Sequence, residues 1–401
     1  MQKFKNTRVG ISEFSMFTRV VKKQAEAILN DLEKNKSKIP DLKPKDLLRD
    51  IETDQSKISK LRGTMIIPYD NCTEICYYGD KININLNIES LDKCHNCETC
   101  IIGVRITTFS PIALVIDDKT DIDGIMAEYN KNISSLSKSM PAFSEYTISE
   151  IDYSILFDLN ELGHEFVTDE LWDIVQRGIY SSYYSKKKYD SSPVTRLETN
   201  IKSNDSGSEW ISVRHIRDYC ENKNVPVNNA GKNSTNMILF MASLETKDSI
   251  NTIMRELIKK HSEDEIYKNG NILLMKHLLS EERIKAVIRE YFECTIMRGS
   301  YFKLPLAVEA VQNSDYNKEK KQEMITALKL ISDSGDVHNA RKHIVKNQMV
   351  FPCFNEALQN LVNIGVNPIT IPDEFNIDHI SGLLETCESL VYDSTQPVAK
   401  S

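Results

Sequence analysis

The chain has 401 residues, of which 40% are apolar and 27% are charged, and its formal net charge is −8. This composition is typical of a globular protein, and the length suffices for two or three domains, so wholesale disorder is excluded. The negative net charge argues against a protein that coats DNA through its overall charge, but it is compatible with a local basic groove.

The N-terminal sequence MQKFKNTRVGISEF lacks the apolar core of a signal peptide, and no apolar run approaches the ~20 residues of a membrane-spanning helix. Nine cysteines without an export signal are expected to be thiols or metal ligands rather than disulfides. We therefore expect a cytoplasmic protein with no membrane partner.

Residues 1–60 are predicted to form a helical leader. Apolar residues between Phe17 and Leu32 recur with the period of 3.6 residues that is typical of an amphipathic helix. A second, polar helix is expected from Lys43 to about Lys60, after a stop at Pro40.

Residues 61–145 are predicted to form a cysteine-rich β-region. Its short apolar runs are separated by Gly, Asp and Asn, which is typical of strands joined by turns. The predicted strands cover residues 64–69, 74–79, 82–88, 100–107 and 112–116, and an amphipathic helix follows from Asp121 to about Leu136.

Five of the nine cysteines lie close together in this region, at Cys72, Cys76, Cys94, Cys97 and Cys100. Tetrahedral zinc takes four thiolate or imidazole ligands, and paired C-x(2–4)-C units can supply them. Four of these cysteines, or three of them with His95, are therefore candidate ligands of a structural Zn²⁺. The alternative is that they are small buried apolar residues within strands.

A strand predicted over residues 147–162 alternates strictly between apolar and other side chains. One face would carry Ile151, Tyr153, Ile155, Phe157 and Leu159. The other face would carry Glu150, Asp152, Ser154, Leu156 and Asp158. We expect the first face to belong to the core and the second to project carboxylates into an open, polar space.

The remaining sequence is predicted to form two further domains and a tail. Residues 146–260 would form an α+β core, with a helix at residues 168–177 and further strands at 194–201, 209–216 and 237–244. Residues 261–390 follow helical periodicity and would form a helical C-terminal domain, and residues 391–401 a flexible tail. No internal repeat is visible in the sequence.

Five segments between Ile148 and Leu384 carry a family resemblance. They read ISEIDYSILFDLNEL, LWDIVQRG, YFECTIMRGSYFKLPLA, ITALKLI and GVNPITIP. In the order and spacing of these segments the chain resembles replication proteins of phages and plasmids of Clostridia-like bacteria, which in turn resemble the filamentous-phage replication initiator. The resemblance implies an α+β fold with a central antiparallel sheet of the replication-initiator type.

The resemblance also implies an activity, namely DNA nicking that starts rolling-circle replication. A tyrosine hydroxyl would attack a phosphodiester, form a 5′-phosphotyrosyl bond and release a 3′-OH primer, with the help of Mg²⁺ or Mn²⁺ held by acids or histidines. Asp152 matches the Ile-Asp strand position of the family and is the candidate for the metal site. The segment EWISVRHIRDYC adds His215 as a further candidate and Tyr219 as the candidate nucleophile.

A Tyr- and Lys-rich segment provides candidate contacts to DNA. Lys186, Lys187 and Lys188 could hold a single-strand backbone while bases stack on Tyr183 and Tyr184. The alternative for this segment is a solvated loop with half-buried rings. The expected partner is single-stranded or origin DNA, and a homo-oligomer and host replication proteins are further candidates.

The sequence departs from the family pattern in two places. The expected Arg-Phe-Glu strand aligns with residues 239–243, which contain neither Arg nor Glu, and the chain has no His-x-His pair. The alternative function is therefore a catalytically inactive DNA-binding protein, or a zinc-stabilised interaction protein, of the same fold.

Overall fold

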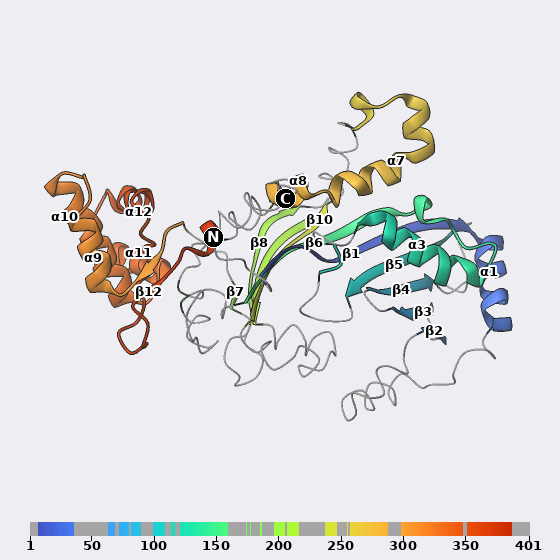
Figure 1. The fold of residues 1–401 in the computed structure, drawn as a ribbon, viewed down its shortest axis with the longest axis horizontal. Helices are drawn as coiled ribbons and strands as arrows, with labels where there is room; N and C mark the ends of the chain where they lie inside the picture. Colours follow the sequence, from blue (N-terminus) through green and yellow to red (C-terminus); the bar gives the residue numbers. More distant parts are fainter. Residues whose placement is uncertain are drawn as a thin grey trace, which may run out of the picture.

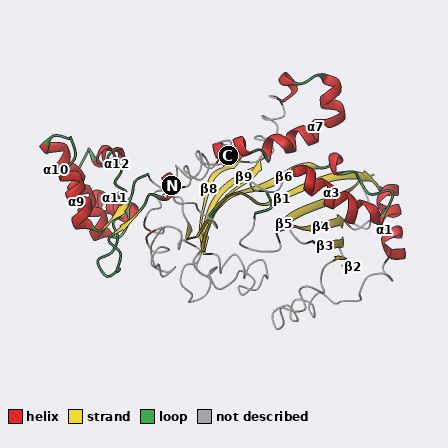
Figure 2. Ribbon diagram, viewed as in Figure 1, coloured by secondary structure: helices red, strands yellow, loops and turns green. Residues whose placement is uncertain are grey.

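The computed structural model has an α+β fold, drawn in Figures 1 and 2. It describes residues 7–35, 63–68, 72–79, 82–89, 99–108, 114–116, 121–158, 185–186, 196–204, 207–215, 237–246, 257–287, 298–347 and 351–386, with Ile174, Arg177 and Arg255. Among the helices in these ranges, none combines the length and the apolar character needed to cross a lipid bilayer.

A ten-stranded antiparallel sheet forms the centre of the molecule, with the strand order β2-β3-β4-β5-β1-β6-β10-β9-β8-β7. The expected antiparallel sheet is thus present. Its strands are β1 (Arg8–Val21), β2 (Gly63–Pro68), β3 (Cys72–Tyr78), β4 (Ile82–Glu89), β5 (Thr99–Thr108), β6 (Thr147–Asp158), β7 (Ser185–Lys186), β8 (Arg196–Asn204), β9 (Gly207–His215) and β10 (Met237–Thr246).

The two halves of this sheet have the same topology. In the first half, β1 pairs with β5, and β5, β4, β3 and β2 follow as a meander; in the second half, β6 pairs with β10, and β10, β9, β8 and β7 follow in the same way. Residues after β1 form the helix α1 (Lys22–Asn35), and Ile174 and Arg177, which follow β6, are also helical. Because β1 and β6 pair antiparallel, an approximate two-fold axis relates the halves. The sequence carries no signal of this repeat.

The sheet also corrects two of the predicted domain assignments. Residues 8–21, assigned to a helical leader, form a strand in the middle of the sheet, and only the following residues of α1 are helical as expected. The apolar residues of this segment fit both the 3.6-residue period of a helix and the two-residue period of a strand. The segment forms a strand because it pairs with β5 on one side and with β6 on the other. The boundary predicted at residue 145 separates two halves of one continuous sheet rather than two domains.

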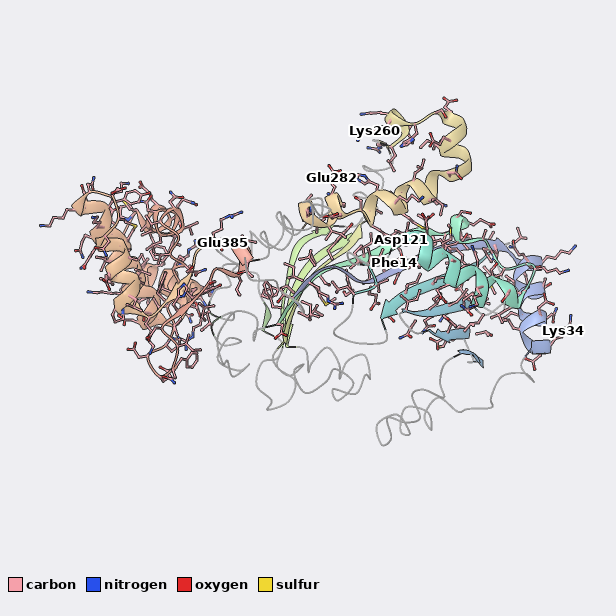
Figure 3. The ribbon with its side chains drawn as sticks, in the orientation of Figure 1. Phe14, Lys34, Asp121, Lys260, Glu282 and Glu385 are labelled. Atoms are coloured by element: carbon pink, nitrogen blue, oxygen red, sulfur yellow. The ribbon has the colours of Figure 1, made fainter. Side chains whose placement is uncertain are left out.

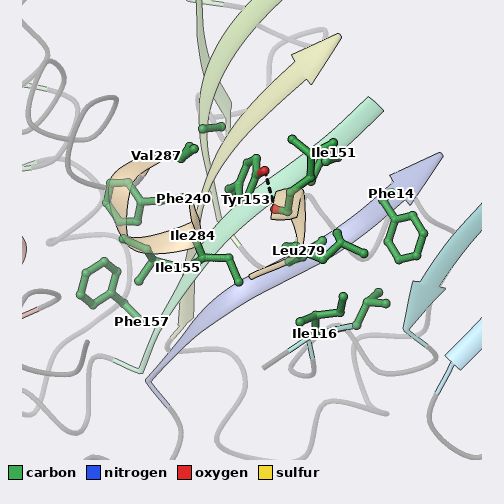
Figure 4. Close-up of a cluster of buried hydrophobic side chains, with 14 of the residues drawn as sticks. Phe14, Ile116, Ile151, Tyr153, Ile155, Phe157, Phe240, Leu279, Ile284 and Val287 are labelled. Carbon is green, nitrogen blue, oxygen red and sulfur yellow. Dashed lines mark hydrogen bonds between the residues drawn. The ribbon is translucent and has the colours of Figure 1, made fainter. Parts of the chain in front are cut away.

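Helices cover one face of the sheet and form the main core with it. These are α1, α3 (Ile122–Asn132), α7 (Glu263–Leu278) and α8 (Glu281–Val287). Apolar side chains of the strands, including Phe14, Ile151 and Phe240, form one buried cluster with Ile284 and Val287 of α8 (Figure 4). The Tyr153 hydroxyl donates to the carbonyl oxygen of Leu278 at 2.7 Å and so fixes the end of α7 to β6.

The C-terminal part forms a separate, mainly helical unit, which lies beside the sheet in Figure 1. The short strands β11 (Tyr301–Phe302) and β12 (His379–Ile380) pair antiparallel, and α10 (Lys318–Ser334) packs against all three other helices. Those helices are α9 (Leu304–Gln312), α11 (Val337–Lys346) and α12 (Phe354–Asn363). Asn317 and Asp336 cap α10 and α11 with their side chains, and Gly335, with φ of +81°, ends α10. The expected helices are present in this unit, but α7 and α8, which the prediction assigned to the same domain of residues 261–390, pack on the sheet.

Close contact between backbones makes Gly10 a sensitive position of the sheet. Beyond the end of β5, Ile116 pairs with Ile11 of β1, and its carbonyl oxygen lies 2.0 Å from where a Cβ of residue 10 would be. A side chain here would force the two segments apart. Gly103 in β5, by contrast, has no atom within 4 Å of its added Cβ.

We therefore expect Gly10→Ala to lower the free energy of unfolding by about 1–3 kcal/mol, the usual cost of overpacking. Gly103→Ala, the matched control, is expected to change it by less than about 1 kcal/mol, since alanine suits a strand better than glycine. Urea denaturation followed by circular dichroism measures both variants. Equal effects of the two substitutions would contradict the close approach at Gly10.

Candidate functional site

The face of the sheet opposite α1, α3, α7 and α8 carries polar residues where the two halves meet. Glu13 of β1 is paired in register with Asp152 of β6, and Ser15 is paired with Glu150 on one side and with Arg105 on the other. We call the positions on this face at the β1–β6 junction the polar row; it consists of Glu13, Ser15, Arg105, Glu150, Asp152 and Ser154.

An ion pair and hydrogen bonds hold the polar row together. Arg105 Nε lies 2.9 Å from Glu13 Oε1, and the Glu13 side chain is 6% exposed whereas that of Arg105 is 54% exposed. A β-bulge between Ile11 and Glu13 brings Ser12 beside this row. The Ser12 and Ser154 hydroxyl oxygens lie 2.7 Å apart, and Ser12 also donates to the backbone carbonyl of Asp152 at 3.4 Å.

The expectation of an open, wet face on this strand is wrong. All residues from 151 to 158 are buried, and Asp152, Ser154 and Asp158 are 6%, 0% and 1% exposed. The alternation correctly predicts that Ile151, Tyr153, Ile155 and Phe157 belong to the core. It could not show that the polar face is buried as well, because segments distant in the sequence cover it. Leu114 and Ile116, for example, lie against Gly10, which is paired with Ser154.

The cross-strand pairing shows on which face of the sheet His215 and Asp152 lie. His215 is paired with Ile238, which is paired with Phe157, whereas Asp152 is paired with Ser243, which is paired with Trp210. Successive residues of a strand point to opposite faces, so the backbone positions of His215 and Asp152 belong to different faces of the sheet. The prediction that the two residues act in one site is therefore wrong.

Several other predicted site residues lie outside the described ranges. These are Tyr183, Tyr184, Lys187, Lys188, Cys94, Cys97 and the candidate nucleophile Tyr219. Lys186 belongs to the short edge strand β7, of which only the backbone is described.

The described cysteines do not converge on one metal ion. Cys72 and Cys76 both lie on β3, where a separation of four residues corresponds to about 13 Å. Zn–S bonds of about 2.3 Å cannot connect side chains that far apart. Cys100 of β5 shares its row with the core residues Ile102 and Val104, on the face opposite to Cys72 and Cys76, and is fully buried. The predicted four-ligand zinc site, drawn from the five cysteines and His95, can therefore contain at most one of Cys72, Cys76 and Cys100.

Three tyrosines lie in the core on the helix-covered side. The Tyr129 hydroxyl oxygen lies 2.9 Å from the Tyr146 hydroxyl oxygen and 3.1 Å from the carbonyl oxygen of Pro141, and the Tyr153 hydroxyl donates to Leu278 as described. Burial raises the pKa of Tyr129, Tyr146 and Tyr153 above the usual value of about 10. A phenol that resists ionisation and is enclosed by apolar side chains is unsuited to act as a nucleophile.

A cavity of about 340 Å³ lies in the C-terminal unit, where the chain enters and leaves it. The carboxylate of Glu385, a residue labelled in Figure 3, lines this cavity. It accepts a hydrogen bond of 2.8 Å from the backbone N–H of Gly299. Gly299 has φ of +103° and approaches the backbone of Val366 and Asn367 closely. The glutamate thus stabilises a tight crossing of two chain segments.

Sequence reasoning missed Glu13 and Arg105 as members of the candidate site. Glu13 lay just before the predicted helix, and Arg105 in a β-region that was considered for its cysteines. The order Ile11-Ser12-Glu13-Phe14-Ser15-Met16 alternates from residue 13 onward and could have indicated a strand with a polar face.

Within the described residues, no group of three or more His, Cys, Asp and Glu side chains is arranged to hold a metal ion. No protein-family model and no curated protein sequence matches this chain. The geometry that can be examined for function is therefore that of the polar row, with its two buried, adjacent carboxylates.

The buried tyrosines predict how stability depends on alkaline pH. In the folded state they keep their protons above pH 10, whereas in the unfolded state they lose them, so their contribution to stability is complete below pH 10 and is lost as the pH rises above it. We expect Tyr153→Phe to reduce the slope of unfolding free energy against pH, between pH 10.5 and 11.5, by up to about 1.4 kcal/mol per pH unit. Urea titrations measure this slope, and an unchanged slope would contradict the raised pKa.

The cysteine geometry predicts which thiols bind zinc. Cys72 is paired in register with Glu89, the last residue of β4, and Cys94 and Cys97 follow five and eight residues later in the sequence. We expect the purified chain to hold one zinc ion, to lose it in Cys72→Ser and Cys97→Ser, and to keep it in the control variants Cys76→Ser and Cys100→Ser. Elemental analysis checks this. Absence of zinc from the unaltered chain, or its loss in either control, would refute the assignment.

Proposed function

We propose that the chain is a DNA-nicking protein of the replication-initiator type, with a divalent-metal site in the polar row. The observation that carries the proposal is the pairing of Glu13 with Asp152. These acids come from equivalent strands of the two halves and stand directly opposite each other, 5% and 6% exposed. Like charges directly opposite each other in a sheet are destabilising, so their retention requires positive charge or shared protons nearby.

The residues of the polar row suit a hard cation. Mg²⁺ and Mn²⁺ prefer oxygen ligands, and Mg²⁺ is commonly held by one or two carboxylates, with water or substrate phosphate in the remaining positions. Asp152 and Glu13 would hold the ion. The hydroxyl of Ser15, in register with Glu150, is buried without a hydrogen-bond partner among the described residues and offers one more oxygen. The bound ion would polarise a phosphodiester oxygen.

Arg105 is the side chain of this row that suits a phosphate group. Its guanidinium contacts Glu13 with one nitrogen, while more than half of the side chain is exposed. A planar, permanently charged fork of this kind binds phosphate oxygens well. We assign to Arg105 the binding of the DNA backbone, and to Tyr219, as in the family that the sequence resembles, the attack on the phosphodiester.

The proposal predicts nicking of supercoiled plasmid that carries the DNA flanking this chain's own gene, in the presence of Mg²⁺ or Mn²⁺. We expect Asp152→Asn to reduce nicking at least about 100-fold, the scale expected when one electrostatic group of an active site is removed. Tyr219→Phe should abolish both nicking and the covalent protein–DNA adduct. Gel electrophoresis of the plasmid, with and without protease treatment, measures both outcomes.

Metal binding gives a second readout of the same site. Titration calorimetry with Mn²⁺ is expected to show binding to the unaltered chain and its loss in Asp152→Asn. The control is Asp123→Asn in α3, whose side chain is 60% exposed and lies outside the polar row. Nicking that survives in both Asp152→Asn and Tyr219→Phe would overturn the proposal.

The alternative is a DNA-binding protein of the same fold that does not cleave. It is favoured by one observation: in the described strands β1, β6 and β10, the row of Asp152 contains neither Tyr nor His. Intact plasmid with every divalent cation tested, combined with retained DNA binding, would support this alternative.

A further inference from the structure

The helix α11 concentrates positive charge in a chain whose net charge is negative. Its sequence, VHNARKHIVK, contains Arg341, Lys342 and Lys346 and no acidic residue, whereas the whole chain has a formal charge of −8. All three cationic residues are exposed. Among the described residues, neither Lys342 nor Lys346 is seen in an ion pair, so both charges are available to a partner.

The helix α12 presents a row of amide side chains. Asn355, Gln359 and Asn363 are spaced four residues apart, so they lie along one side of the helix, and all three are exposed. Gln359 donates to the Asn363 side chain at 3.1 Å. The opposite side of α12 is buried in the C-terminal unit through Phe354, Ala357, Leu358 and Leu361.

Two side-chain contacts fix α12 relative to its neighbours and keep the surface positive. Arg341 of α11 donates from Nη2 to the Asn355 side-chain oxygen at 3.0 Å. Glu356, the acidic residue of α12, forms an ion pair with Lys320 at the start of α10. The negative charge of α12 is thus compensated inside the unit, and the cations of α11 are left unopposed.

We propose that α11 and α12 form a binding surface for duplex DNA, with α12 in the major groove and α11 against the phosphates. Both helices pack on α10, and Arg341 of α11 contacts Asn355 of α12, so the cations and the start of the amide row lie next to each other. DNA-binding proteins commonly place one exposed helix in the major groove while neighbouring cations contact the phosphates. Asn and Gln side chains pair with the N6 and N7 groups of adenine, so the surface selects sites that contain A·T pairs. Lysines and the arginine of α11 contact the backbone without regard to sequence.

The surface suits DNA better than a membrane. A helix that binds an anionic bilayer presents large apolar side chains next to its cations. Here the exposed side of α12 carries amides, and on α11 the exposed large apolar residue is Val345 alone. Amides provide hydrogen-bond donors and acceptors, which base edges in the major groove can match.

The α11–α12 surface contains no residue of the polar row, so duplex binding can be tested separately from nicking. Binding of intact duplex needs neither a divalent ion nor a nucleophile. Measured in EDTA, the unaltered chain should therefore still bind duplex. A failure of nicking with retained duplex binding would leave the α11–α12 surface in place.

The test is fluorescence anisotropy of the full chain with labelled 30-base-pair duplexes, one rich in A·T and one rich in G·C, over a range of salt concentrations. We expect Lys342→Gln combined with Lys346→Gln to weaken binding to both duplexes at least tenfold. The slope of log K against log salt should fall by about 2, since each lost phosphate contact lowers it by about 0.9. Gln359→Ala combined with Asn363→Ala should instead reduce the preference for the A·T-rich duplex.

The matched control is Lys259→Gln combined with Lys260→Gln, which removes two exposed lysines before α7 (Figure 3). It is expected to change affinity less than twofold, and circular dichroism confirms that each variant is folded. Equal losses in the control and in the α11 variant, no duplex binding by the unaltered chain, or binding of anionic vesicles in preference to duplex would overturn the proposal.

Discussion

Strand β1 hydrogen-bonds along one edge to β5 and along the other to β6, and through these two pairings it joins the halves of the sheet. The same pairing sets Glu13 opposite Asp152 and buries both. Helices of the covered face depend on it too, because α1 follows directly from β1 and α8 packs against it. If this pairing were absent, each half would expose an unpaired strand edge, and the polar row would not exist.

Burial of carboxylates at this junction is the feature that most needs a chemical reason. A buried acid is stable when it is paired or hydrogen-bonded, and Arg105 provides one such partner for Glu13. Replacement of the acids by apolar residues would fill the sheet interior without this requirement. In the function that we propose, these two carboxylates hold a divalent ion.

Much of the fold can be predicted from the sequence, and the failures have identifiable causes. The strands at residues 82–88 and 100–107 and the helices of the C-terminal unit follow clear periodicity, and local pattern and tertiary structure agree there. Residues 8–21 fail because their apolar residues fit two periods, and the choice between them comes from strands far away in sequence. In the candidate site, Asp152 can be identified from the sequence. Glu13 cannot, because its pairing with Asp152 joins strands more than a hundred residues apart and leaves no local signal in the sequence. Likewise, the spacing of Cys72 and Cys76 suggests a pair of zinc ligands only if the chain turns between them. Both residues lie on the extended strand β3, which keeps them apart.

The equal topology of the two halves has a consequence for the origin of the chain. Two units that meet edge to edge about a two-fold axis have the geometry of a symmetric dimer, and here one polypeptide contains both. Fusion of two copies releases them from the need to stay identical. In the present chain the pairing of β1 with β6 needs no second subunit, and the two halves differ in sequence without a visible repeat.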